Sequence, residues 1–546
     1  MRARIEPFKC WSLHGFKFLC SPPDGVILVN KVFVSALLGI YFFTATVLPQ
    51  AARPAGTAKK LAAEPVKTAP TTEPRRQDFA VPFVNKTLAN GLEVIVLPDS
   101  SVPLVTVELA VRNGSFTEPP ELNGLSHLYE HMFFKPNRAE YLMRCEDVLR
   151  GGRQPAPICD VPLRMKSTIG DVQFLRNIET LGLRRNGTTR EEVVNYYFTT
   201  TSPYLEAAVK LINSSVRFPT FDEEEFENEK KVVIGELDRI EANPYGLLTQ
   251  MLTEKLFYRY PTRKMPGGTR KTVAAATTDQ MRTIQSRYYF PNNAALVVTG
   301  DVKPDEVFHV AEQIMGSWEK RAVDPFKEFP LVEHPALTKS EGVIIEKNTG
   351  EATQGAEQNV FIQIGWHGPS IGKDDRSTYA ADVFSYILQQ PDSRFQRNLV
   401  DKGLASSAAI GYYTQRNVGP IVITLVTTPD KAKEALKAAY AEVAQFSNPT
   451  YFKDEELESS KTILENTDLF EREKTSEYAH TLGFWWSSTG IDYFRGYHKN
   501  LRATSRADIE RYVTTYIKDK PHIGIALMSP DAKTKAGIVE SDLIGK

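Results

Sequence analysis

The stretch His127-Leu128-Tyr129-Glu130-His131 governs the interpretation of the rest of this sequence. On a helix, residues four apart lie one above the other on the same face, so His127 and His131 can point two imidazoles at one metal ion. Glu130 lies on that side too, where its carboxylate can act on a water molecule. Two neutral imidazoles beside a carboxylate are typical of a hydrolytic zinc site, and the order H-x-x-E-H is the inverzincin signature. The alternative is two histidines on a half-buried helix face that are satisfied by backbone groups or water.

An acidic helix downstream supplies a candidate for a third metal ligand. The segment FDEEEFENEKKVVIGELDRI predicts a helix that begins at Asp222, with acidic residues in its first turn, as the helix dipole favours. Its buried stripe consists of Phe226, Val233 and Ile240. Glu229 and Glu236 border this stripe, and carboxylates held toward a core need a partner such as a metal ion. Alternatively, both carboxylates reach solvent from a highly charged helix.

The segments around these two helices predict the elements of a mixed domain. Residues 92–97 and 105–111 are apolar and β-branched and predict strands. Apolar residues at helical spacing in 204–216 predict a helix. The segment Asn186-Gly187-Thr188-Thr189 precedes residues 191–199, which we expect to form a short helix capped by Thr189.

The N-terminal region predicts export. An apolar run over residues 32–48 follows Lys31 and precedes Ala51-Ala52. This arrangement is typical of a secretory signal, so we expect residues 1–52 to be a signal peptide and the protein to be periplasmic or otherwise extracytoplasmic. The run is also barely long enough to span a bilayer, which leaves an uncleaved N-terminal membrane anchor as the alternative. Residues 53–78 are rich in Pro and Ala and predict a disordered linker.

Length and composition limit the other possibilities. A chain of 546 residues has room for two to four domains. The net charge of -1 gives no reason to propose nucleic acid as a partner. Four cysteines are too few for a disulfide scaffold.

Several motifs together resemble the pitrilysin/insulinase family of zinc peptidases, and most of all its bacterial members related to the β subunit of the mitochondrial processing peptidase. The motifs are Asn123-Gly124-Leu125-Ser126 before HLYEH, Met132-Phe133-Phe134-Lys135 after it, Asn186-Gly187-Thr188-Thr189 followed by Tyr196-Tyr197, Glu229-x6-Glu236, Arg287-Tyr288-Tyr289-Phe290-Pro291-Asn292-Asn293, and VVTGD over 297–301. The resemblance extends over nearly all of residues 80–535.

The resemblance implies a role for each candidate site residue. His127, His131 and Glu236 are expected to ligate one zinc ion per chain. Glu130 is expected to be the general base that activates a water, and Glu229 a second carboxylate that orients a ligand. The implied function is that of a zinc-dependent metalloendopeptidase that hydrolyses peptides or unfolded segments. The alternative is a catalytically inactive family member that acts as a binding or scaffold subunit.

The implied fold class is α+β, with two homologous domains that together form half of a clamshell. Each domain is expected to be a largely antiparallel sheet covered by helices. We expect a zinc-binding peptidase domain over 79–319, an interdomain linker over 320–340 and a metal-free homologous domain over 341–535.

A faint internal repeat supports this duplication. Residues 221–236 align with 452–467, which places Ser460 opposite Glu229 and Thr467 opposite Glu236. The second copy has therefore lost the carboxylates.

One segment of the first domain is longer than is usual in the family. Residues 136–172, between the H-x-x-E-H motif and the acidic helix, are rich in Gly, Pro and Arg and predict an inserted loop near the site. This loop contains Cys145 and Cys159, which we expect to pair in an oxidising compartment. The alternative is two free thiols.

Two substitutions in the second domain suggest that the chain does not work alone. Many relatives have an Arg and a Tyr there that help to bind substrate, and Val400 and Ser406 stand at these positions. The resemblance therefore implies a heterodimer with a homologous subunit that lacks the zinc motif; a homodimer is the alternative. In the family, the substrate is held as an added strand at a sheet edge near Asn186.

Overall fold

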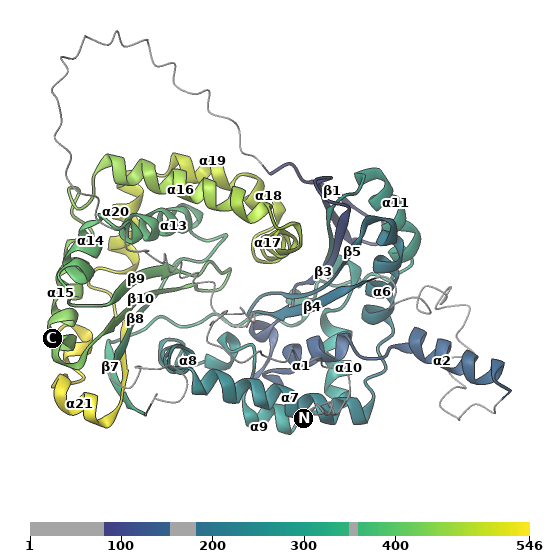
Figure 1. Ribbon diagram of the computed structural model, residues 1–546, viewed down its shortest axis with the longest axis horizontal. Helices are drawn as coiled ribbons and strands as arrows, with labels where there is room; N and C mark the ends of the chain where they lie inside the picture. Colours follow the sequence, from purple (N-terminus) through teal and green to yellow (C-terminus); the bar gives the residue numbers. More distant parts are fainter. Residues whose placement is uncertain (1–80, 153–181, 349–358) are drawn as a thin grey trace, which may run out of the picture. The chain divides into compact units, whose positions relative to one another are not determined.

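The computed structural model describes residues 81–152, 182–348 and 359–546 (Figure 1). The predicted signal peptide or anchor (1–52) and the predicted linker (53–78) lie outside the described residues. Within the part of the chain that is described, no helix has the length and apolar character needed to cross a membrane.

The first sheet has six strands in the order β1-β2-β6-β3-β5-β4. The strands are β1 (Val84–Thr87), β2 (Glu93–Pro98), β3 (Leu104–Val111), β4 (Arg184–Thr189), β5 (Val194–Thr201) and β6 (Ala294–Gly300). Strands β2 and β6 are parallel, and all other neighbours are antiparallel. Strand β4 forms one edge of the sheet.

The second sheet repeats this topology. Its strands are β7 (Glu341–Glu346), β8 (Val360–His367), β9 (Ser407–Tyr412), β10 (Pro420–Thr427) and β11 (Ile523–Met528). They lie in the order β7-β11-β8-β10-β9, with only β7 and β11 parallel. Without β1, both sheets place their strands in the order first, fifth, second, fourth, third, so the predicted α+β fold with two homologous, largely antiparallel sheets is confirmed.

Helices follow the same plan in the first half of the chain (described residues before 320) and in the second half (described residues after 340). The first half contains α1 (Leu125–Phe133), α2 (Arg138–Arg150), α6 (Leu205–Arg217), α7 (Glu223–Ala242), α8 (Pro244–Leu256), α9 (Arg270–Ala274), α10 (Thr278–Tyr288) and α11 (Pro304–Met315). Between the halves lies α12 (Pro325–Glu328). The second half contains α13 (Asp375–Gln389), α14 (Arg394–Gln396), α15 (Ala432–Gln445), α16 (Asp454–Arg472), α17 (Thr475–Ser488), α18 (Ile491–Arg495), α19 (Tyr497–Ala503), α20 (Arg506–Tyr516) and α21 (Pro530–Ala536).

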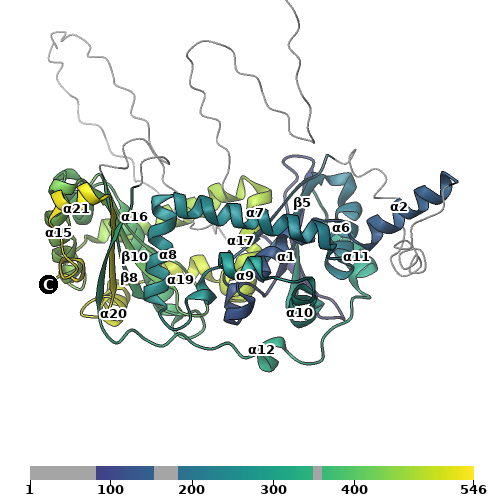
Figure 2. The ribbon, with the colours of Figure 1, turned by 90° about the horizontal axis from the view of Figure 1, so that it is seen from below.

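Each sheet is covered on one face by helices of its own half and on the other face by a helix of the other half. Residues of α1, α6, α7, α10 and α11 form one core with the first sheet. Helix α17 packs on β3 and β6 of that sheet, although it belongs to the second half. In return, α8 packs on β8 and β11 of the second sheet. Figure 2 shows α7 running into α8, which begins at the cap residue Asn243.

Four of the predicted elements are confirmed. Strands β2 and β3 cover the predicted segments 92–97 and 105–111, and α6 covers the predicted helix over 204–216. Helix α7 begins after Asp222, whose side chain accepts hydrogen bonds from the next turn.

The helix predicted over residues 191–199 is wrong, and the segment forms strand β5 instead. The strand pairs with β3 on one side and with β4 on the other. Val194, Tyr196, Phe198 and the threonines that follow are β-branched or aromatic residues, which fit a half-buried pleated surface better than a helix. Thr189 therefore caps no helix but lies in strand β4.

The predicted inserted loop begins with a helix rather than a loop, because α2 covers residues 138–150. Asn137 accepts hydrogen bonds from the backbone of Ala139 and Glu140 and so caps its start. Ala139 and Leu142 are buried. Cys145 on this helix is disulfide-bonded, and Cys159, its predicted partner, lies outside the described residues.

Trp486 fixes helix α17 on the first sheet. Its side chain is 2% exposed, and Nε1 donates a hydrogen bond to Oε2 of Glu93 at 2.7 Å. The guanidinium of Arg112 lies 4.0 Å from the centre of the indole ring. A large apolar contact, a hydrogen bond and a cation–π contact therefore join the two halves at one residue.

Replacing Trp486 by Ala should lower the free energy of unfolding by about 3–5 kcal/mol, because it leaves a cavity between α17 and the sheet. Urea unfolding followed by circular dichroism measures this change. Phe470→Ala on α16 is the control: Phe470 is 72% exposed, so its removal should change stability by less than about 0.5 kcal/mol. Equal stability of Trp486→Ala and the unmodified protein would show that α17 does not hold the halves together.

Candidate metal centre

Helix α1 is positioned by a buried carboxylate at its start. The helix begins after Gly124, which has a left-handed backbone (φ 89°) and no side chain to cap the helix. The backbone N–H groups of Gly124 and Ser126 donate instead to the carboxylate of Glu118, at 2.7 and 2.5 Å. A Cβ on Gly124 would lie 2.8 Å from Cα of Gly268, so the start of α1 is also closely packed against a neighbouring loop.

The structure brings three of the predicted residues together. Nε2 of His127 and Nε2 of His131 each lie 3.5 Å from Oε2 of Glu236 on α7. These ligand atoms all lie within 4.8 Å of one another. Two ligands of a tetrahedral zinc lie about 3.4 Å apart when their bonds are about 2.1 Å long. The donor set and its spacing therefore fit a zinc ion.

Glu229 orients one of the imidazoles. Nδ1 of His131 lies 2.8 Å from Oε2 of Glu229. If Nδ1–H is the donor, the lone pair of Nε2 faces Glu236 and is available to a metal. The other oxygen of Glu229 lies 2.5 Å from Nζ of Lys135, which also pairs with Glu225 at 3.2 Å.

The electrostatics of the two histidines differ. Burial lowers the pKa of His127 to about 4, with a contribution from the nearby His131, so this imidazole is neutral and able to bind a metal. Burial also lowers the pKa of His131, but hydrogen bonds to Glu229 and Glu236 outweigh it and raise this pKa to about 10. The carboxylates thus favour a positive charge at this point, which either a proton or a metal ion can supply.

Glu130 lies beside the cluster and is held from strand β4. Its Oε2 accepts a hydrogen bond from Oγ1 of Thr189 at 2.9 Å. A Cβ on Gly187 would lie 2.6 Å from both Cγ and Oε1 of Glu130, so the glycine leaves the space that this side chain occupies. Burial raises the pKa of Glu130 to about 7, although His131 and Thr189 oppose the shift.

Four residues that position the site are not indicated by the sequence patterns. Thr189 is predicted as a helix cap rather than as the partner of Glu130, and the patterns assign no role to Glu118, Lys135 or Gly187. Lys135, Gly187 and Thr189 do stand in the motifs Met132–Lys135 and Asn186–Thr189. Their contacts, like those of Glu118, depend on tertiary structure and cannot be derived from these motifs.

The second half contains the counterpart of this site. Nε2 of Gln390 donates to Oγ of Ser460 at 2.6 Å, and Tyr386 hydrogen-bonds Thr467. Ser460 and Thr467 are the residues that the repeat aligns with Glu229 and Glu236. Tyr386 and Gln390 are four apart, as His127 and His131 are, so Tyr386-Ile387-Leu388-Gln389-Gln390 corresponds to the H-x-x-E-H stretch.

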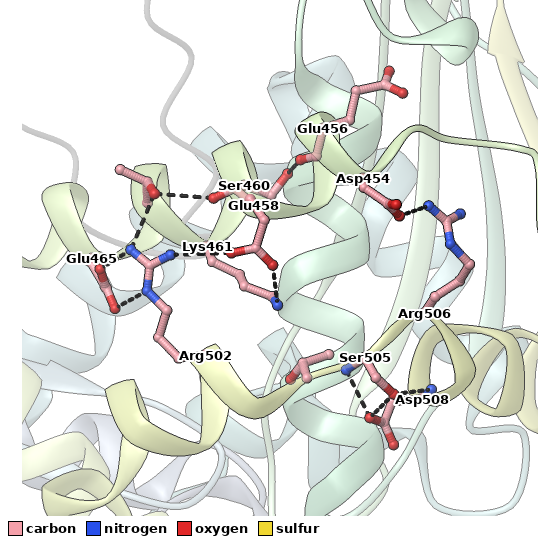
Figure 3. Close-up of polar contacts among 12 residues, drawn as sticks. Asp454, Glu456, Glu458, Ser460, Lys461, Glu465, Arg502, Ser505, Arg506 and Asp508 are labelled. Atoms are coloured by element: carbon pink, nitrogen blue, oxygen red, sulfur yellow. Dashed lines mark hydrogen bonds and ion pairs between the residues drawn. The ribbon is translucent and has the colours of Figure 1, made fainter. Parts of the chain in front are cut away.

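Two acidic residues on α16 near this counterpart have basic partners. Figure 3 shows Ser460 on α16 with Glu458 and Glu465 nearby. Glu458 pairs with Lys461 at 2.8 Å, and Glu465 accepts hydrogen bonds from Arg502. The metal-free character of the second half stays a prediction.

Comparison with known families agrees with this geometry. A model described as "Insulinase (Peptidase family M16)" matches residues 94–142 and 166–266, and one described as "Peptidase M16 inactive domain" matches 275–464. Together they cover more than half of the 546 residues. The chain belongs to the insulinase/pitrilysin family of zinc proteases, as the sequence motifs predicted.

Individual relatives are distant in sequence. "Zinc protease PqqE" of Helicobacter pylori is 22% identical over 453 residues, which cover 81% of this chain and 92% of the relative. A "Probable mitochondrial-processing peptidase subunit beta" of Arabidopsis thaliana is 23% identical over 48% of this chain and 43% of its own length. The crystal structure of a protease from Helicobacter pylori has a TM-score of 0.66 at 20% identity, over 82% of this chain and 99% of that one. The last comparison shows a shared fold.

Glu118→Gln should lower the free energy of unfolding by about 1–3 kcal/mol. The NH2 group of the glutamine would face one of the two buried backbone N–H groups, and two donors cannot form a hydrogen bond with each other. Urea unfolding of the metal-free protein measures the change. Glu121→Gln is a matched control, because Glu121 is exposed in the same segment and its change should stay below about 0.5 kcal/mol. Equal stability of the two variants would contradict the role of Glu118 at the start of α1.

Proposed function

We propose that this protein is a zinc-dependent metalloendopeptidase that hydrolyses peptides or unfolded protein segments. The observation that carries this proposal is the convergence of His127, His131 and Glu236, with Glu130 beside them. The two histidines and Glu236 would hold one zinc ion per chain. A bound zinc would acidify water and polarise the carbonyl of the scissile bond.

The side chains around the metal have separate tasks in this proposal. Glu130 is not one of the proposed metal ligands. It would take the proton from the attacking water and pass it to the nitrogen of the leaving amine. The hydrogen bond from Thr189 and the space above Gly187 orient its carboxylate for this transfer. Glu229 would act as a positioning residue, because its contact with His131 fixes the ring and its tautomer.

Strand β4 offers a place for the substrate. It is an edge strand of the first sheet, and it contains the residues that flank Glu130. An extended peptide that adds to this edge would be bound mainly through its backbone and would pass beside the metal ligands. Folded proteins present few such extended segments, which favours peptides and unfolded chains as substrates.

At two positions of the second half, Val400 and Ser406 replace the Arg and Tyr that help many relatives to bind substrate. Oγ of Ser406 donates to the carbonyl oxygen of Val426 at 3.1 Å, and Val400 has no side-chain donor. We therefore propose that this chain is the catalytic subunit of a heterodimer with a homologous subunit that lacks H-x-x-E-H and supplies an Arg and a Tyr. A homodimer that uses other donors is the alternative.

The proposed localisation of the protein rests on its N-terminal region. The apolar run over residues 32–48 after Lys31 supports export to the periplasm or another extracytoplasmic compartment, with cleavage near Ala51 or retention as an anchor. An oxidising compartment would also suit a disulfide between Cys145 and Cys159.

Variants of the site test the peptidase against the catalytically inactive alternative. Glu236→Gln should lose the metal, because it removes a ligand. Glu130→Gln should keep about one zinc per chain but lower the rate of peptide cleavage by about 10²–10⁴-fold. Metal analysis and cleavage of an unstructured fluorogenic peptide measure both effects. Glu224→Gln, at an exposed position of α7, is the control and should retain metal and rate.

Two outcomes of this experiment would count against the proposal. Zinc-free protein from a metal-supplied preparation would remove the metal site. Equal rates for Glu130→Gln and the unmodified protein would show that Glu130 is not the general base.

Activity with and without a partner tests the heterodimer. The isolated chain should cleave an unstructured peptide slowly, and the copurifying homologous subunit should restore the rate. The two can be compared after separation by size-exclusion chromatography. Full activity of the isolated chain would exclude the heterodimer, and a dimeric mass for that active species would favour the homodimer.

A further inference from the structure

The two faces of strand β4 point to different surroundings. Strand register places Arg185 opposite Phe198 and Gly187 opposite Tyr196. Phe198 and Tyr196 belong to the core that includes α1. Since directly paired residues point to the same face of a sheet, Arg185 and Gly187 face α1. Arg184, one residue earlier, points to the opposite face.

Arg185 lies at a defined distance from the reacting position. Residues two apart along a strand are separated by about 6.8 Å, so Arg185 lies this far from Gly187, which contacts Glu130. Its Nη1 is 3.5 Å from the carbonyl oxygen of Phe134, at the end of α1. The guanidinium is therefore beside the C-terminal end of the helix that carries the metal-binding histidines.

The charge of Arg185 has no acidic partner within the described part of the chain. The side chain is exposed, and no carboxylate of the described segments pairs with it. The nearby acidic residues are occupied: Glu225 and Glu229 both pair with Lys135. Glu236 faces the two histidines. As far as the described residues are concerned, the charge of Arg185 is thus available to a bound ligand.

We propose that Arg185 is a specificity-determining residue that selects an acidic side chain in the substrate, two residues from the scissile bond. This inference rests on the proposed peptidase function and on a peptide added at strand β4. In an added strand, the residue beside Gly187 lies next to Glu130, and the residue two positions away on the same face lies beside Arg185. A carboxylate there can accept two parallel hydrogen bonds from the guanidinium, which an amide or an apolar side chain cannot do.

A set of matched peptides tests the proposal on the zinc-loaded full-length chain, with its partner subunit present if cleavage requires one. The peptides share one cleavage site, verified by mass spectrometry, and carry Asp, Asn or Lys in turn at each of the four positions on either side. Asp at one position, two residues from the cleaved bond, should raise kcat/KM by about two- to fivefold over Asn, as an exposed ion pair does. The ratio of Asp to Asn within one variant does not depend on how much of that variant is folded.

Variants of the two neighbouring arginines assign the effect. Arg185→Ala should abolish the preference for Asp, Arg185→Lys should retain part of it, and Arg185→Glu should shift it to Lys. Arg184→Ala is the matched control, because it removes the same charge from the other face of the same strand and should keep the preference. Binding of the same peptides to Glu130→Gln protein, followed by fluorescence anisotropy, provides a readout that needs no turnover.

The outcomes distinguish a failure of this inference from a failure of the proposed peptidase function. Cleavage without any difference between Asp and Asn peptides would refute the role of Arg185 but would not contradict the proposed peptidase function. Loss of the preference in Arg184→Ala to the same degree would show a general effect of charge and refute it as well. Absence of cleavage of every peptide by the zinc-loaded protein would refute the peptidase itself.

Discussion

Both faces of each sheet are apolar, and this constraint determines how the two halves of the chain are joined. In β2, for example, Val94 and Val96 belong to one core while Ile95 and Leu97 belong to another. The helices of the first half bury only one of these faces. Helix α17 buries the other, and α8 does the same for the second sheet. Neither sheet is fully buried without the other half of the chain, so we expect the two halves to unfold together.

The packing of a helix from each half on the sheet of the other half also anchors the candidate metal centre. Helix α7, which carries Glu229 and Glu236, continues into α8 after a single cap residue, Asn243. The far end of the acidic helix is therefore attached to the second sheet, while α1 is held at its start by Glu118. The ligands come from two elements that are each anchored outside the site. Such anchoring keeps metal ligands at their required spacing.

Features that depend on periodicity can be predicted from this sequence, whereas those that depend on tertiary contact cannot. Spacings of four and seven residues on helices single out His127, His131, Glu229 and Glu236 as candidates. The resemblance to the family, and not the spacing, distinguishes Glu236 as the expected ligand. The segment over 191–199 is predicted wrongly because its β-branched and aromatic residues gain their stability from pairing with β3 and β4. The role of Glu118 has no sequence signal, since it contacts backbone groups rather than a motif. Trp486 likewise acts on strands nearly four hundred positions away in the sequence.

The second half shows that this arrangement of helices also forms with neutral side chains at the positions of the candidate ligands. There, Gln390 and Ser460 share a hydrogen bond at the position of His131 and Glu229, and neutral side chains fill the remaining positions. The same packing of two helices against a sheet is thus available without carboxylates at the positions of Glu229 and Glu236. Carboxylates removed from water cost free energy unless they are paired. The fold alone therefore does not explain their presence in the first half, whereas the proposed metal site would.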